Sequence, residues 1–335
     1  MFRRYYNVSR RCSACAFGTR SADEAVAHTR QPGHTIAIRD SITDAMWPIL
    51  REREDKAIIY ETDDDHFAIR SWNGYYPDVV AEHPLIRDMA RRADLMTVST
   101  PFIAAHYGPM NPNTRVIRNA VDPALYVADE PRPEGDRPRL LYYGSDARMR
   151  DYALDPISGK VGPAYRAVRD LGGFQRVFIG WNGHPDMKHF WDELVPYIKN
   201  IPAFSKAVAN AHADIGLAPL VGDDFDQAKS ELHWLEYTLG GAATIAQRFS
   251  GPGPYSVIRN GIDGLMARGH QEWHDGLKKL RDNPAFAADL AAAAKERVLA
   301  DYTIEKRAVE WADAFKWAAE NRGIGLSRYR RLVAA

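Results

Sequence analysis

Short apolar runs alternate with longer stretches of helical period along most of this chain. We expect a buried strand in KAIIYETDDDHF, an amphipathic helix in HPLIRDMARRA, a strand in ADLMTVST and a short helix in PFIAAHYG. A helix is also predicted in DAMWPILRERED, and a strand followed by a loop in TRVIRNAVDPALY. Strands that alternate with helices at this spacing are typical of a parallel α/β sheet.

The pattern restarts after a segment that has no apolar period. VADEPRPEGDRP, at 127–138, is rich in proline, glycine and charge, and it predicts a linker between domains. Further strands are predicted in RLLYYGS, FQRVFIGW, AATIAQ, GLMAR and the end of FSKAVANAHADIGLAPL. Helices are predicted in KSELHWLEYTLGG and YSVIRNG, and at 270–283, 285–300 and 304–321. Two Rossmann-like halves follow, and because ligands bind at the carboxyl ends of parallel strands, a site in a cleft between the halves is expected.

The composition is that of a soluble globular protein. Of 335 residues, 45% are hydrophobic, and 44 basic residues balance 44 acidic ones. This length favours two domains, since single cores stop growing at roughly 250–300 residues. We expect no membrane span, because no apolar run reaches about 18 residues. The first residues, MFRRYYNVSRRC, lack the apolar core of a secretory signal, and a cytoplasmic location is expected.

Four metal-binding side chains lie close together near the N-terminus. Their spacing is Cys12-x2-Cys15-x12-His28-x5-His34. Two thiolates and two imidazoles provide the tetrahedral ligand set that structural zinc prefers. The alternative is that scattered cysteines and histidines coincide. We predict a zinc-binding module over residues 1–38, because so short a segment gains stability from a metal.

This segment resembles a two-Cys, two-His zinc finger, most closely the matrin type. It departs from the usual pattern in the position of Phe17, two residues after Cys15, and in Ala25, where leucine is common. Residues 1–39 also carry seven arginines against two acidic residues. That local positive charge permits contact with a phosphate backbone, and a purely structural role for the module stays open.

Three ordered blocks in the rest of the chain point to one family. IIYETDDDHF, ADLMTVSTPFIAAHY…TRVIRNAVDPALY and KSELHWLEYTLGGAATIAQ…PYSVIRNGIDGLMA resemble segments of GT-B glycosyltransferases, particularly family 4 and its phage and bacterial relatives. The resemblance covers about residues 56–320 and implies two Rossmann-like domains that face a cleft. The expected divisions are the module at 1–38, a shortened acceptor-side domain at 39–130, a donor-binding domain at 131–321 and a tail at 322–335.

The block that begins with Lys229 carries the residues expected at a nucleotide-sugar donor. Lys229 and Ser230 come at the start of a predicted helix, where backbone N–H groups and the helix dipole favour a phosphate. Glu236 is suited to accept hydrogen bonds from ribose hydroxyls, although it could be an exposed helix residue instead. The family usually has an acidic residue eight positions earlier, but Ala228 stands there in this chain.

Further donor contacts are expected from loops. Gly144 and Ser145 end a predicted strand, and there the backbone can approach the phosphates. Arg148 is a candidate counter-charge for the diphosphate, with a solvated surface arginine as the alternative. Tyr255 follows the glycines of SGPGPY in a second loop near the donor.

The acidic turn after the first strand could be read in two ways. In GT-A enzymes an Asp-x-Asp pair holds a divalent cation at the donor phosphates. GT-B enzymes do not need that ion, so no catalytic metal is expected. We predict instead that Asp64 and Asp65 position the acceptor or assist proton transfer, and that His66 acts as a base or acceptor contact. A loop histidine without a role is the alternative.

The resemblance implies a retaining glycosyltransferase with a nucleotide-sugar donor, most simply a UDP-hexose or UDP-pentose. The basic module favours DNA as the acceptor, through a hydroxylated or hydroxymethylated pyrimidine that would be flipped out of the duplex. A surface glycan or a protein is the alternative acceptor, with the zinc module purely structural. A non-catalytic nucleic-acid-binding GT-B protein is the third possibility. The sequence does not determine the oligomeric state.

Overall fold

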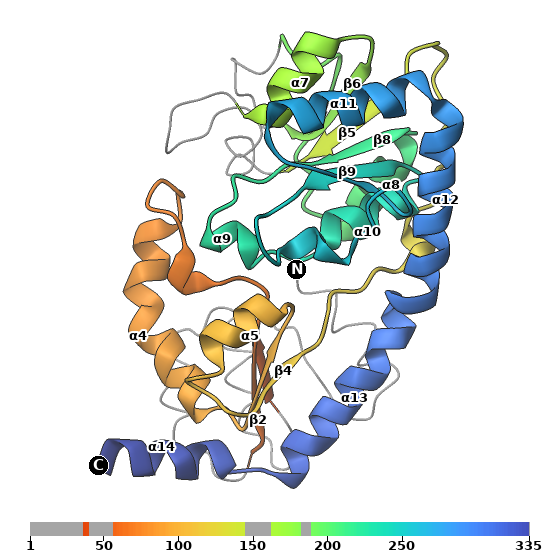
Figure 1. Cartoon of the computed structure of the whole chain (residues 1–335). Helices are drawn as coiled ribbons and strands as arrows, with labels where there is room; N and C mark the ends of the chain where they lie inside the picture. Colours follow the sequence, from red (N-terminus) through yellow and green to blue (C-terminus); the bar gives the residue numbers. More distant parts are fainter. Residues whose placement is uncertain (1–35, 40–55, 145–161, 182–188, 335) are drawn as a thin grey trace. The chain divides into compact units, whose positions relative to one another are not determined.

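The chain divides into two compact units. The computed structural model describes residues 36–39, 56–144, 162–181 and 189–334 (Figure 1). Residues up to 71, 75–118 and 304–335 group into the first unit, and residues 72–74 and 119–303 into the second. The C-terminal helices therefore belong with the first unit. Among the described helices, none has the length and apolar character needed to cross a bilayer.

The first unit is built on a four-stranded parallel sheet. Its strands are β1 (Ile36–Arg39), β2 (Ile58–Thr62), β3 (Leu95–Val98) and β4 (Thr114–Val116), and they lie in the order β1-β2-β3-β4. Its helices are the 3-10 turn η1 (His66–Ala68), α4 (Tyr76–Arg92), α5 (Pro101–Tyr107), α13 (Ile304–Glu320) and α14 (Ile324–Ala334). Phe315 of α13 packs with Ile59 and Leu95 in the core of this unit. Apolar strands covered by amphipathic helices thus form this core.

The second unit has a six-stranded parallel sheet in the order β10-β9-β8-β5-β6-β7. The strands are β5 (Arg139–Tyr143), β6 (Gln175–Trp181), β7 (Glu193–Pro196), β8 (Ile215–Ala218), β9 (Ala243–Gln247) and β10 (Leu265–Ala267). The helices are η2 (Pro123–Leu125), α7 (Pro163–Leu171), α8 (Ile201–Asn210), α9 (Asp224–Gln227), α10 (Leu232–Leu239), η4 (Pro254–Val257), α11 (Gly269–Asp282) and α12 (Pro284–Asp301). The first strand, β5, lies in the middle of the sheet. Strands β6 and β7 extend the sheet on one side of it, and β8, β9 and β10 then extend it on the other, which is the doubly wound order.

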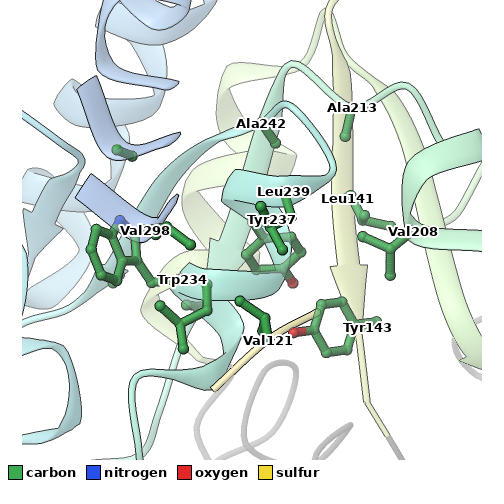
Figure 2. Packing of buried hydrophobic residues seen from close by; sticks show 14 of the residues in the cluster. Val121, Leu141, Tyr143, Val208, Ala213, Trp234, Tyr237, Leu239, Ala242 and Val298 are labelled. Carbon is green, nitrogen blue, oxygen red and sulfur yellow. The ribbon is translucent and has the colours of Figure 1, made fainter. Parts of the chain in front are cut away.

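Helix α10 packs closely on this sheet (Figure 2). Trp234 and Tyr237 of α10 are fully buried in a cluster that also holds Val298 of α12. A Cβ atom added to Gly216 of β8 would lie 2.3 Å from the Tyr237 ring. The glycine therefore sets the distance between α10 and the sheet, and with it the position of every side chain that α10 carries.

The predicted parallel α/β architecture is confirmed, and most predicted elements are present. The main differences are α7, β7, α9 and α14, which the pattern did not indicate, and η4, a short 3-10 turn where a helix was expected in YSVIRNG. Of the predicted zinc module at 1–38, only residues 36–38 are described, and they belong to strand β1, which the pattern did not indicate. The helix predicted in DAMWPILRERED lies outside the described residues.

Candidate functional site

The topology of the second unit indicates where a ligand would bind. Strands β5 and β8 are neighbours at the point where the strand order reverses. In doubly wound sheets, ligands bind at the carboxyl ends of the strands that flank this point. Those ends are followed here by Gly144 and by the loop at 219–231.

The carboxyl ends of β5 and β6 lie unusually close together. The Gly144 amide donates a hydrogen bond to the Ile179 carbonyl at 3.1 Å. A Cβ atom on Gly180, whose φ is 111°, would lie only 2.1 Å from the Gly144 oxygen. Both the left-handed backbone and the close approach require glycine at position 180. This leaves the backbone at Gly144 without a covering side chain from its neighbour.

The loop after β8 is fixed by two aspartates. The carboxylate of Asp226 is fully buried and accepts hydrogen bonds from the amides of Val221 at 2.6 Å and Gly222 at 3.2 Å. Asp223 caps α9 by accepting from the Asp226 amide at 3.0 Å. These bonds hold the backbone that leads to Lys229 in one conformation.

Lys229 and Ser230 come just before α10, with the N-cap residue Glu231 between them and the helix, as predicted for a helix start. The Lys229 ammonium lies 4.0 Å from the centre of the Phe225 ring, a cation–π contact that keeps the charge beside the loop. The Ser230 hydroxyl accepts a hydrogen bond from the Asn119 side chain at 2.5 Å. A cation, a hydroxyl and the first N–H groups of α10 are therefore gathered in one place, an arrangement that suits an anion.

Glu236 lies one turn into α10 and is bonded to the end of β5. The hydroxyl of Tyr143, the last residue of β5, donates a hydrogen bond to Oε2 of Glu236. Burial of Tyr143, reinforced by the nearby charge of Glu236, raises its phenol pKa well above 10.0. Tyr143 therefore remains a hydrogen-bond donor at every physiological pH, and it holds the half-buried carboxylate in place.

Tyr255 belongs to the same side-chain network but is buried. Its hydroxyl lies 3.1 Å from Nδ1 of His233, whose ring is 4.5 Å from that of Tyr143 between centres. Tyr255 belongs to the buried cluster of Figure 2, in which Tyr143 and Tyr237 are labelled. Tyr255 thus supports the residues around Glu236 from the inside, and its predicted contact with a donor stays a prediction.

The acidic turn of the first unit follows β2. The Asp65 side chain is fully buried, and its Oδ1 accepts a hydrogen bond from the Phe67 amide at 3.1 Å. Its other oxygen, Oδ2, is bonded to Nδ1 of His106 on α5. The His106 side chain is 40% exposed. Sequence reasoning missed this histidine, because the two residues meet only through the pairing of β2 with β3, which the sequence pattern does not specify.

Asp64 and His66 lie in a turn whose backbone is held from two sides. The Thr62 hydroxyl donates to the Asp64 carbonyl at 2.8 Å, and it also accepts from the Asp64 amide at 3.3 Å. Nε2 of His83 is 2.9 Å from the His66 carbonyl. The turn is therefore ordered by side chain–backbone bonds, and the predicted roles of Asp64 and His66 stay predictions.

Comparison with known proteins agrees with the fold. Residues 163–313 match the family model described as "Glycosyl transferase-like". The sucrose-phosphate synthase of Thermosynechococcus elongatus has 14% sequence identity and a TM-score of 0.65; the match covers 88% of this chain and 76% of that one. A glycosyltransferase from Rickettsia africae ESF-5 has 11% identity and a TM-score of 0.60, with coverage of 92% and 84%. The Anabaena protein Alr3699/HepE, in complex with UDP and glucose, has 11% identity and a TM-score of 0.60, with coverage of 88% and 80%. Among curated proteins no sequence matches this chain.

The chain is a glycosyltransferase, and its fold is that of GT-B enzymes. The family model covers the segment that carries Lys229, Ser230 and Glu236, and the solved structures share the fold. The predicted enzyme class and GT-B architecture are confirmed.

Several predicted site residues of this glycosyltransferase lie outside the described residues. These are Ser145 and Arg148 of the donor loop, and the metal ligands Cys12, Cys15, His28 and His34. In the part of the chain that the structure describes, no group of three or more His, Cys, Asp or Glu side chains is placed to hold a metal ion. The predicted zinc site therefore stays a prediction.

Proposed function

We propose that this glycosyltransferase transfers a sugar from a UDP-sugar and that the second unit binds the donor. The observation that carries the proposal is the placement of Lys229, Ser230 and Glu236 together, on and before α10, beside the point where the strand order reverses. The Anabaena protein of the same fold binds UDP and glucose in its structure, which supports this donor class.

Each of these groups suits a different part of the donor. The Lys229 ammonium, the Ser230 hydroxyl and the N–H groups at the start of α10 suit the diphosphate. The carboxylate of Glu236 suits the ribose hydroxyls, because an ionised carboxylate only accepts hydrogen bonds and the hydroxyls can donate them. Tyr143 occupies one of its oxygens from the protein side and so directs the carboxylate. Gly144 has no side chain that would keep a phosphate away from its backbone.

In the reaction, the acceptor oxygen forms a bond to the anomeric carbon while the bond from that carbon to the diphosphate oxygen breaks. The diphosphate takes the electron pair, and the Lys229 cation stabilises the charge that develops there, while a base takes the proton of the acceptor hydroxyl. Family resemblance implies that the configuration at the anomeric carbon is retained.

For the acceptor, we propose a hydroxylated or hydroxymethylated pyrimidine in DNA. The support is the concentration of arginines within residues 1–39 and the predicted Cys–His module in the same segment. A surface glycan or a protein is the second candidate, with that module serving only to stabilise the chain.

Donor binding is tested by calorimetry with UDP. We expect Lys229→Ala to weaken UDP binding by about 10- to 100-fold, because a charge-assisted contact to the diphosphate is worth roughly 1.5–3 kcal/mol. Glu236→Gln should weaken it by about 10-fold. Lys295→Ala, on the exposed face of α12, is the matched control and should bind as the wild type does. Wild-type protein that binds none of UDP, ADP and GDP would refute the donor class.

The acceptor is tested by transfer of label from UDP-[14C]glucose and other UDP-sugars. DNA that contains 5-hydroxymethylcytosine in place of cytosine is compared with unmodified DNA. Label that enters only the hydroxymethylated DNA supports the proposal. Label in neither DNA, from a protein that binds UDP, favours a glycan or protein acceptor instead.

A further inference from the structure

In the Asp65–His106 pair of the first unit, the aspartate is buried and the histidine is partly exposed. Asp65 is fully buried, and both of its carboxylate oxygens are occupied, one by the Phe67 amide and one by His106. His106, at the other end of the pair, keeps 40% of its side chain exposed. A group that is fully buried and bonded at both oxygens cannot reach a substrate, whereas the imidazole can.

The pairing also determines where the imidazole carries its proton. A carboxylate is only an acceptor of hydrogen bonds, so Nδ1 of His106 must be the donor toward Asp65. In neutral imidazole the other nitrogen, Nε2, then has a free lone pair. Of the described residues, none is hydrogen-bonded to that nitrogen. The arrangement leaves a hydrogen-bond acceptor of fixed direction on a partly exposed ring.

The ring itself is held in place by the start of its helix. The Thr100 hydroxyl caps α5 by accepting from the Ile103 amide at 3.3 Å. The Phe102 ring lies 4.7 Å from the imidazole between centres, on the same short helix. The bond to Asp65 and the contact with Phe102 both restrict the imidazole ring, so His106 needs little reorganisation before it binds a ligand.

We propose that His106 contacts the acceptor and that Asp65 is a positioning residue that acts through it. Nε2 accepts a hydrogen bond from the attacking hydroxyl, which orients the hydroxyl and increases the electron density on its oxygen, and Nε2 takes the proton as that oxygen bonds to the anomeric carbon. This assigns to His106 the role that sequence reasoning gave to Asp65. The inference rests on the proposed function, since it requires that a hydroxyl be the acceptor.

The protonation state of the ring is measured first, by 15N NMR of the histidine side chains at neutral to mildly alkaline pH. His106→Gln identifies the His106 signals. We expect the wild type to show a proton on Nδ1 and none on Nε2. Asp65→Asn should reverse this, because the amide oxygen keeps the Phe67 bond and its NH2 group then faces Nδ1. A proton on Nε2 in the wild type, or no change in Asp65→Asn, would overturn the proposal.

The effect on turnover is measured with UDP-glucose, both as hydrolysis, where water replaces the acceptor, and as transfer to 5-hydroxymethylcytosine DNA. We expect His106→Gln and Asp65→Asn to lower turnover by about 100-fold or more, within the range typical of positioned acid–base groups. UDP affinity should stay within about 2-fold of the wild type, because the donor contacts lie on the second unit. His274→Gln, on the partly exposed surface of α11, is the control.

The two proposals fail in different ways. If the wild type binds no nucleotide, the proposed donor class is refuted. The NMR experiment then still shows which nitrogen of His106 carries the proton. Normal UDP binding with wild-type turnover in His106→Gln refutes the role of His106 alone. If UDP binds but no turnover is detected in the wild type, the proton position on His106 remains the deciding measurement.

Discussion

Asp94 of the first unit and Asp263 of the second are both buried aspartates, but their partners differ. Asp94 accepts hydrogen bonds from two backbone amides, those of Ile58 and Gly325, each at 2.9 Å. Asp263 accepts one backbone amide on Oδ1, that of Arg259 at 2.6 Å, while its Oδ2 faces two guanidinium groups: Arg259 donates to it at 2.6 Å and Arg297 at 2.9 Å. The hydrogen bonds to the buried carboxylate thus come from backbone amides in one unit and mainly from cations in the other.

The kind of partner that a carboxylate has also affects its pKa, and so the way in which stability depends on pH. Burial raises the pKa of Asp94 above its ordinary value of 3.8, although the amides of Gly325 and Ile58 oppose the shift. In the second unit, a hydrogen bond from Arg139 lowers the pKa of Glu193 below 4.5. These two acidic groups therefore respond to pH in opposite directions.

The largest expected effect comes from removing the charge at Asp263. In Asp263→Asn the guanidinium groups of Arg259 and Arg297, which both bond Oδ2, lose their charged acceptor, and the new NH2 group faces either them or the Arg259 amide. Breaking a buried ion pair from one side typically costs about 3–5 kcal/mol. We expect a loss of about 3 kcal/mol in unfolding free energy, at the lower end of that range, because Arg259 is half-exposed and can rehydrate. Urea unfolding measures it.

A matched control separates burial from charge. Asp282 on α11 also pairs with two cations, Lys278 and Arg281, but it is exposed. Asp282→Asn should leave the urea midpoint unchanged, because exposed ion pairs contribute little. Equal losses of unfolding free energy in the two variants would show that the loss comes from the cationic partners and does not depend on burial.

Much of the fold follows from the apolar pattern, since buried parallel strands are short continuous apolar runs. The strands in KAIIYETDDDHF and RLLYYGS are predictable because the ends of such runs are marked by charge or glycine. The packing of Phe315 against Ile59 could not be predicted, because it joins residues 256 positions apart. No local period reports which sheet a terminal helix will cover.

The candidate site was predictable only where one segment supplies several groups. Lys229, Ser230 and Glu236 lie within eight residues, so their common location follows from a single helix. Their supports do not: Tyr143 reaches Glu236 from 93 residues away in the chain. His106 and Asp65 are 41 residues apart and meet only because β2 and β3 are neighbours. Pairings of this kind depend on sheet order, which the sequence pattern does not specify.

Asp94 provides the next test of the comparison. The asparagine introduced by Asp94→Asn could accept from only one of the two amides, and a buried amide without a partner costs about 1–3 kcal/mol. Removal of the desolvated charge offsets part of that, so we expect a net cost of about 1–2 kcal/mol at neutral pH. A folded pKa above 3.8 means that the folded state holds the proton more tightly. The stability of the wild type relative to this variant should then fall as pH rises from about 3.8 through the raised pKa, as urea unfolding at several pH values would show.

The smallest effect, and the sharpest test of the contrast, is expected at Glu193. Arg139 donates to it through two nitrogens, each at 2.8 Å, and the arginine is buried while the carboxylate is 38% exposed. Solvent screening limits the loss in Glu193→Gln to about 1 kcal/mol at neutral pH. Because the folded pKa lies below 4.5, this stability is present above that pH and is lost as pH falls through the lowered value. The wild type and Glu193→Gln should therefore converge in urea midpoint in acid, while Glu296→Gln on α12 matches the wild type throughout. If the difference in stability between the wild type and Glu193→Gln grows in acid instead, as is expected for Asp94→Asn, then the kind of partner does not determine the direction of the pH dependence.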